Sequence, residues 1–219
     1  LERSLNNSDF LPVTYHLPVA VCVMRVDKDY HIQAATSLDT PEFRTREIVR
    51  DFWRGLNLYN KASLVTFNGR GFDLPLMELM AFRYGLGTSD YFQKVRPKYN
   101  AQHLDLFDFF TNFGACRLMG GLNLFSKILG KPGKMDLTGD QVYHFYQAGK
   151  IQEINDYCVF DTLDTYFVFL RTRVMIGEIT LDHEQELVAQ AKQWLSEKAQ
   201  TQPALQQYLE NWGTWEPWP

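Results

Sequence analysis

The chain has 219 residues, of which 45% are hydrophobic and 15% aromatic, enough to bury the core of one large domain, alone or with an appendage. Its net charge of -4 argues against a broad basic surface that binds nucleic acid, although a local strip of basic residues can bind nucleic acid on an acidic protein. The three cysteines, Cys22, Cys116 and Cys158, are widely separated and lack CxxC spacing, which argues against a disulfide scaffold and a zinc site.

The sequence contains neither an apolar run of membrane-spanning length nor a secretory signal at Leu1 to Asp9. We therefore expect no membrane partner and a cytoplasmic location.

The first part of the chain predicts strands on either side of a helix. Val19 to Val26 is a β-branched, almost wholly apolar run, and Tyr30 to Ser37 continues it after a polar turn, which predicts a β-hairpin. Thr45 to Tyr59 has apolar residues at helical spacing, and Ser63 to Phe67 predicts the next strand.

The central part predicts a helix, a strand and a basic loop. The helix covers Leu74 to Tyr84 and is closed by Gly85, a common helix stop. His103 to Leu106 predicts a short strand that enters an aromatic helix, and Gly130 to Lys134 predicts a loop.

The last part of the chain has apolar residues at helical spacing. Gln141 to Ala148 and Gln152 to Ile176 predict helices, the second with many aromatic residues on its buried side. Beyond Gly177, two amphipathic helices are predicted over Asp182 to Gln200 and Pro203 to Trp212. We therefore predict a domain over residues 1–177 and a helical extension with a Trp-rich tail over residues 178–219.

The first group of candidate functional residues follows the strand that ends at Phe67. The sequence from Asn68 to Asp73 lies where a strand gives way to a helix, a position at which open α/β sheets assemble active sites. The alternative interpretation is a tight Asn-Gly turn followed by a helix that Asp73 caps.

The second group lies on the long predicted helix. Tyr157 and Asp161 are four residues apart, which places a phenol and a carboxylate on one helix face. The alternative is a polar edge on a core-facing helix, since Asp156 and Asp164 lie nearby.

Together, the two groups resemble two motifs of the DEDDy 3'→5' exonucleases. Asn68, Phe72 and Asp73 fit the second motif, N-x-x-x-F-D, and Tyr157 with Asp161 fits the third, Y-x-x-x-D. The order VTFNGRGFDLP, HLDLFDFF, SKILGKPGKMDLTGDQV and EINDYCVFDTLDTY is most similar to the predicted exonucleases related to the proofreading domain of family B DNA polymerases.

This resemblance implies an α/β fold with a ribonuclease-H-like mixed sheet flanked by helices, followed by the helical appendage. It also implies hydrolysis of phosphodiester bonds at the 3' end of single-stranded DNA or RNA, with two Mg²⁺ or Mn²⁺ ions held by carboxylates. Asp161 would bind one metal directly, Asp73 would bind the second directly or through water, and Tyr157 would orient the attacking water.

The resemblance further implies residues that hold the nucleic acid. Asn68 and Phe72 would support the second motif and touch the terminal nucleotide, with the Phe72 ring available for base stacking. On charge and position, Lys131 and Lys134 of the basic loop are expected to contact phosphates.

The first motif of the family, D-x-E on the first strand, does not occur before Asn68. The D-x-E from Asp182 to Glu184 comes after the third motif, and there we expect a helix start with Asp182 as N-cap and Gln185 in the capping-box position. We expect the first strand and its carboxylates to precede Leu1, and a chain without them to lack activity.

Three alternatives stay open from the sequence. A catalytically inactive nucleic-acid-binding or protein-interaction module could keep the fold, and an accessory subunit could dock its Trp-rich tail on a partner. His103 and Asp105 form an H-x-D pair that could bind a metal, although alternation along a strand explains the pair more simply.

Overall fold

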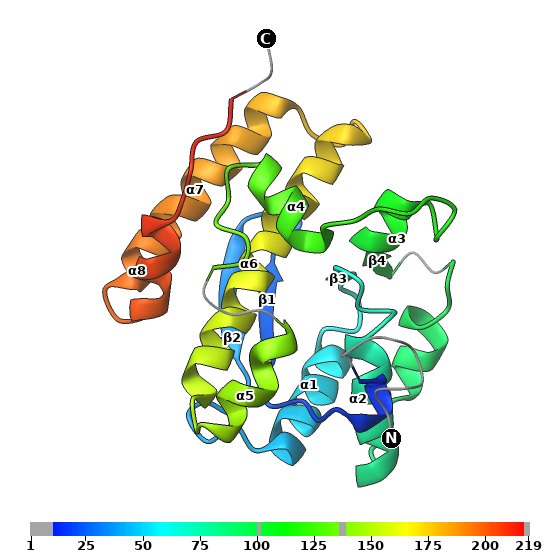
Figure 1. Cartoon of the computed structure of the whole chain (residues 1–219). Helices are drawn as coiled ribbons and strands as arrows, with labels where there is room; N and C mark the ends of the chain where they lie inside the picture. Colours follow the sequence, from blue (N-terminus) through cyan, green and yellow to red (C-terminus); the bar gives the residue numbers. More distant parts are fainter. Residues whose placement is uncertain (1–10, 100–101, 136–138, 217–219) are drawn as a thin grey trace. The chain divides into compact units, whose positions relative to one another are not determined.

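A computed structural model of the chain describes residues 11–99, 102–135 and 139–216. The described residues form a mixed α/β structure rich in helices, which confirms the predicted class (Figure 1). Strands and helices follow in chain order: η2 Val13–Tyr15, β1 Cys22–Val26, β2 Ile32–Ser37, α1 Thr45–Leu58, β3 Leu64–Thr66, α2 Asp73–Tyr84, η3 Tyr91–Val95, β4 His103–Asp105, α3 Leu106–Thr111, α4 Gly121–Ile128, η4 Gly139–Gln141, α5 Val142–Gln147, α6 Ile151–Met175, α7 Leu181–Ala199 and α8 Pro203–Glu210.

The strands form two pairs. β1 pairs with β2 as the predicted hairpin, and β3 pairs with β4 in parallel, with Leu64 opposite His103 and Thr66 opposite Asp105. No strand among the described residues joins the two pairs, so the single mixed sheet that the resemblance implied is not seen there.

The chain divides into two compact units. The first consists of the described residues within 1–21, 37–117 and 138–154, and the second of those within 22–36, 118–137 and 155–219. The boundary passes through the last residue of β2 and the first turn of α6.

The core of the first unit forms between α1, α2 and η3. Trp53 is 2% exposed, and its indole nitrogen donates a hydrogen bond to the Met77 carbonyl at 3.3 Å. Tyr91 packs edge-on against Trp53, with 4.8 Å between ring centroids. Helix α2 ends where Gly85 adopts a left-handed conformation with φ of 67°, as its position in the sequence predicts.

The second unit is organised around α6. The hairpin lies along this helix (Figure 1), and the Thr162 hydroxyl contacts the Cys22 carbonyl at 3.5 Å. Helix α7 is joined to α6 by the ion pair of Arg171 and Glu184 at 2.8 Å, in which Glu184 is 2% exposed. The long predicted helix thus buries its apolar side against both the hairpin and the C-terminal helices.

The D-x-E sequence from Asp182 to Glu184 lies in the first turn of α7, close to the expected helix start, but the cap is different. Thr180 is the N-cap, and its side chain accepts a hydrogen bond from the backbone amide of His183. The prediction of Asp182 as N-cap is therefore wrong, because the hydroxyl of Thr180 satisfies the helix two residues earlier. Within the part of the chain that the structure describes, no helix combines the length and apolar character needed to cross a bilayer.

Candidate functional site

The loop between β3 and α2 carries the second motif and is shaped by its backbone. Asn68 adopts a left-handed conformation with φ of 61°, and its carbonyl accepts hydrogen bonds from the amides of Gly71 at 3.0 Å and Phe72 at 3.2 Å. Gly69 is buried, and a Cβ placed on it would come within 2.6 Å of the Thr66 side chain. The glycine therefore allows the loop to turn closely over the end of β3.

Asp105 at the end of β4 fixes this loop from the neighbouring strand. Its carboxylate accepts hydrogen bonds from the backbone amides of Asn68 at 2.8 Å and Arg70 at 2.9 Å. The same carboxylate caps α3 by accepting from the amide of Phe107 at 3.0 Å. At 4% exposure and with three backbone donors, Asp105 has a structural role and not that of a metal ligand.

His103 completes this arrangement on β4. Its Nε2 lies 3.0 Å from the hydroxyl of Thr66 on the paired strand, and the side chain is buried. Burial, aided by the charge of Arg70, lowers the pKa of His103 to about 4. The H-x-D pair is thus part of the packing of two parallel strands, as the simpler interpretation of the sequence proposed.

The last two residues of the second motif lie at the start of α2. Phe72 is the N-cap position and packs edge-on against His16, with 5.2 Å between ring centroids. Asp73 is the first helical residue and is exposed. The alternative in which Asp73 caps the helix is therefore wrong, because the carboxylate belongs to the first turn, where it complements the helix dipole.

The third motif lies on α6 in the second unit. Tyr157 and Asp161 share one helix face, and the phenol is hydrogen-bonded to the carboxylate. Burial raises the pKa of Asp161 to about 6. The hydrogen bond from Tyr157 and the positive charge of Lys134 each lower that pKa, but they offset the effect of burial only in part. The site thus holds a carboxylate whose charged form a cation would stabilise.

A second carboxylate lies one turn further along α6. Asp164 is 1% exposed and accepts a hydrogen bond from the Tyr208 hydroxyl of α8 at 2.6 Å. Burial raises the pKa of Asp164 to about 6. Hydrogen bonds from Tyr208 and Ser126 lower this pKa in part, and the nearby charge of Asp161 raises it. Asp164 therefore links the carboxylate helix to the C-terminal extension.

The two lysines of the basic loop have different surroundings. Lys131 is 6% exposed, and its ammonium lies 5.0 Å from the Phe167 ring centroid and 4.3 Å from that of Trp212. Burial lowers the pKa of Lys131 to about 8. Lys134 is exposed, and its charge acts on Asp161. Of these two lysines, Lys134 is therefore the one whose side chain is accessible to a phosphate.

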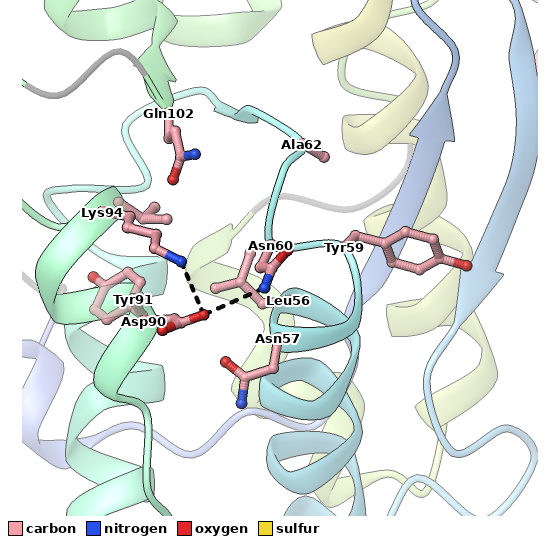
Figure 2. Close-up of a pocket in the computed structure, with 10 residues that line it drawn as sticks. Leu56, Asn57, Tyr59, Asn60, Ala62, Asp90, Tyr91, Lys94 and Gln102 are labelled. Carbon is pink, nitrogen blue, oxygen red and sulfur yellow. Dashed lines mark hydrogen bonds and ion pairs between the residues drawn. The ribbon is translucent and has the colours of Figure 1, made fainter.

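Neither of two surface hollows contains a predicted site residue. In the first unit, Asp90 accepts from Lys94 at 3.1 Å and from Asn60 at 3.5 Å beside a hollow of about 10 Å³, roughly the space of one water (Figure 2). In the second unit, Tyr166 and Trp194 border a hollow of about 160 Å³. Both hollows lack a carboxylate cluster among the residues that line them.

The predicted residues therefore form two groups, one in each unit. Asn68, Phe72 and Asp73 lie together in the first unit, and Tyr157, Asp161 and Lys134 lie in the second. Among the residues that the structure describes, no group of three His, Cys, Asp or Glu side chains could hold a metal ion.

A mixed α/β chain with one carboxylate after a strand-to-helix loop and another paired with a tyrosine on a long helix has the features of an exonuclease-related protein. Residues 8–212 match the family described as predicted 3'-5' exonucleases related to the exonuclease domain of PolB. The match covers most of the chain, which therefore belongs to this family.

A weaker similarity connects the chain to a DNA polymerase of Archaeoglobus fulgidus. The two are 22% identical over 131 residues, which is 56% of this chain and 17% of the polymerase. The chain thus corresponds to a small part of that relative's length.

The sequence did not predict the contacts of the site that join residues far apart along the chain. The role of Asp105 depends on two amides more than 30 positions earlier, and that of Tyr208 on Asp164, 44 positions earlier. Polar residues at predicted core positions were the available signal, because buried polar groups require partners. That signal does not identify which partner each residue takes.

Proposed function

We propose that the protein is a metal-dependent 3'→5' exonuclease of the DEDDy type that removes nucleotides from single-stranded 3' ends. Family membership supports the reaction class, and the observation that carries the proposal in this structure is the hydrogen-bonded pair of Tyr157 and Asp161. The family's ribonuclease-H-like sheet is part of the same proposal.

The environment of Asp161 fits a metal ligand. Burial disfavours its charged form, and within the described part of the chain the cation whose charge lowers its pKa is Lys134, which has an exposed side chain. A divalent cation would reverse the shift by stabilising the carboxylate. When bound, two Mg²⁺ or Mn²⁺ ions would supply activation of water and stabilisation of the leaving oxygen, with Asp161 proposed to hold one ion, Asp73 the second, and further ligands required for both.

The remaining residues act through their own chemistry. The Tyr157 phenol, already oriented by Asp161, would place the attacking water. Asn68 and Phe72 would contact the terminal nucleotide, and Lys134 would contact a phosphate. Lys131 is not among the proposed phosphate contacts, because its ammonium lies against the rings of Phe167 and Trp212.

A second candidate is a nucleic-acid-binding or protein-interaction module on the same fold without activity. The observation that favours it is the absence of a three-ligand cluster within the described residues. The two candidates differ in whether a bound strand is shortened.

The decisive experiment is incubation of the full-length protein with a 5'-labelled single-stranded oligonucleotide in Mn²⁺, beside the Asp161→Ala variant of the same protein and an EDTA control. A ladder of 3'-shortened products that disappears in both controls supports the exonuclease. Glu153→Ala is a matched control, because Glu153 is an exposed acid near the start of the same helix, paired with Lys150. A folded protein that binds the strand without shortening it supports the inactive module instead.

A further inference from the structure

Two aromatic rings and a lysine form an exposed cluster in the first unit. Tyr99 is 85% exposed and Phe113 is 46% exposed, and their ring centroids lie 5.8 Å apart. The Lys98 ammonium lies 4.9 Å from the Phe113 ring centroid and 5.6 Å from that of Tyr99. We name Lys98, Tyr99 and Phe113 the aromatic platform.

The backbone holds Phe113 in an unfavourable conformation. Asn112 and Phe113 both have positive φ angles, of 48° and 55°, just after α3 ends. Asparagine tolerates the left-handed region, but a bulky aromatic residue rarely adopts it. Strain of this kind concentrates at functional sites, and here it accompanies a large ring that stays exposed.

The platform is tethered to the loop of the second motif. The Arg70 guanidinium donates a hydrogen bond to the Arg96 carbonyl at 3.1 Å, two residues before Lys98. Arg70 also forms an ion pair with Asp108 of α3 at 3.2 Å, five residues before Phe113. One side chain of the motif loop thus contacts both segments that carry the platform.

The charge of the platform suits a polyanion. Among the described residues, Lys98 has no ion-pair partner within 4 Å, although its charge acts on the Asp108 carboxylate at longer range. Nearby Arg96, in contrast, is paired with Glu78 at 3.0 Å and Lys94 with Asp90 at 3.1 Å. An unpaired ammonium beside two exposed rings can contact a phosphate while the rings stack on bases. The local positive charge of Lys98 can therefore attract a phosphate even though the chain as a whole carries a net charge of -4.

We infer that the aromatic platform is a binding site for single-stranded nucleic acid, where bases stack on Tyr99 and Phe113 and Lys98 contacts a phosphate. The inference rests on the proposed function for its substrate class and extends it by a surface beyond the motif residues. Stacking and phosphate contacts read neither base identity nor the 2'-hydroxyl, so the site accepts DNA and RNA.

The test is fluorescence anisotropy of the protein with labelled dT20 and rU20 in EDTA, where no hydrolysis occurs. Tyr99→Ala and Phe113→Ala are each expected to weaken binding by at least about fivefold, and Tyr99→Phe to retain it, because stacking needs the ring and not the hydroxyl. Lys98→Ala is expected to reduce the slope of log Kd against log salt by about 0.7, the effect of one phosphate contact on a single strand.

The matched control is the double variant Lys61→Ala/Phe82→Ala. Both residues are exposed in the same unit, Phe82 at 91%, and neither contributes to the platform. Unchanged affinity and salt slope in the platform variants, an equal loss in the control, or no binding by the parent protein would each overturn the inference.

The outcome is separable from that of the proposed function. Loss of binding in the platform variants without any Mn²⁺-dependent ladder in the parent protein supports the platform and contradicts the exonuclease. A ladder from a protein whose affinity does not depend on the platform supports the exonuclease and contradicts the platform.

Discussion

The carboxylate of Asp105 accepts a hydrogen bond at 2.8 Å from the backbone amide of Asn68, although 37 positions separate the two residues. Asn68 begins the loop between β3 and α2, whose sequence resembles the second exonuclease motif, and Asp105 ends β4, the strand paired with β3. The parallel register of β3 and β4 therefore determines the shape of the motif loop.

Replacement of Asp105 tests this relationship. Asp105→Ala removes the acceptor for three buried or half-buried backbone amides, so we expect a loss of about 2 to 4 kcal/mol in unfolding free energy. Urea denaturation measures this loss. Asp108→Ala is a suitable comparison on α3, because Asp108 pairs with Arg70 but accepts from none of these amides. Equal stability of the parent and Asp105→Ala proteins would contradict the structural role.

Replacement of Asp161 should separate stability from activity. Asp161→Asn removes a half-buried charge but keeps an acceptor for Tyr157, so we expect a gain on the order of 1 kcal/mol at pH 7.5 together with loss of the exonuclease ladder. Because the folded pKa of about 6 lies above the usual 3.8, the destabilising contribution of Asp161 in the parent protein decreases as the pH falls from above 6 toward 4. The difference between the two proteins should therefore shrink over that window.

Thermal unfolding at pH 7.5 and pH 4.5 measures this difference. An Asn variant that is less stable than the parent at pH 7.5 would show that the carboxylate is not destabilising in the fold.

The link between α6 and the C-terminal helices depends on the hydroxyl of Tyr208. Tyr208→Phe leaves Asp164 without its 2.6 Å donor in a fully buried site, so we expect a loss of about 1 to 3 kcal/mol. Differential scanning calorimetry should show a Tm lower by several degrees, at about 2 to 4 °C per kcal/mol for a chain of this size. Tyr146→Phe is the control, since Tyr146 is 48% exposed. A similar Tm for the two variants would argue against the link.

The pairing of β3 with β4 can be followed through His103. Its folded pKa of about 4 lies below the usual 6.5, so the unfolded chain binds a proton between these values that the folded chain does not. The contribution of His103 to stability is thus present above pH 6.5 and is lost as the pH falls toward 4. NMR titration of the imidazole, assigned with His103→Gln, should show a neutral ring at pH 5.5, and a midpoint near 6.5 would contradict its burial.

Short-range patterns made much of the secondary structure predictable. The helices at Thr45, Leu74 and Gln152 and the hairpin after Val19 follow from the period of apolar residues and from polar or glycine stops, which act within a few positions. The motif spacing likewise identified the family, and the i, i+4 relation placed Tyr157 beside Asp161.

The sequence by itself determined the helices, the hairpin and the motif residues, because these depend on spacing along the chain. Only the tertiary structure decided that Asp105 holds the motif loop, that Lys131 is enclosed by Phe167 and Trp212, and that Thr180 replaces Asp182 as a cap. The physical reason is that a polar group's role depends on whether folding brings it a partner or leaves it in water, and the positions of such partners follow from packing between distant segments.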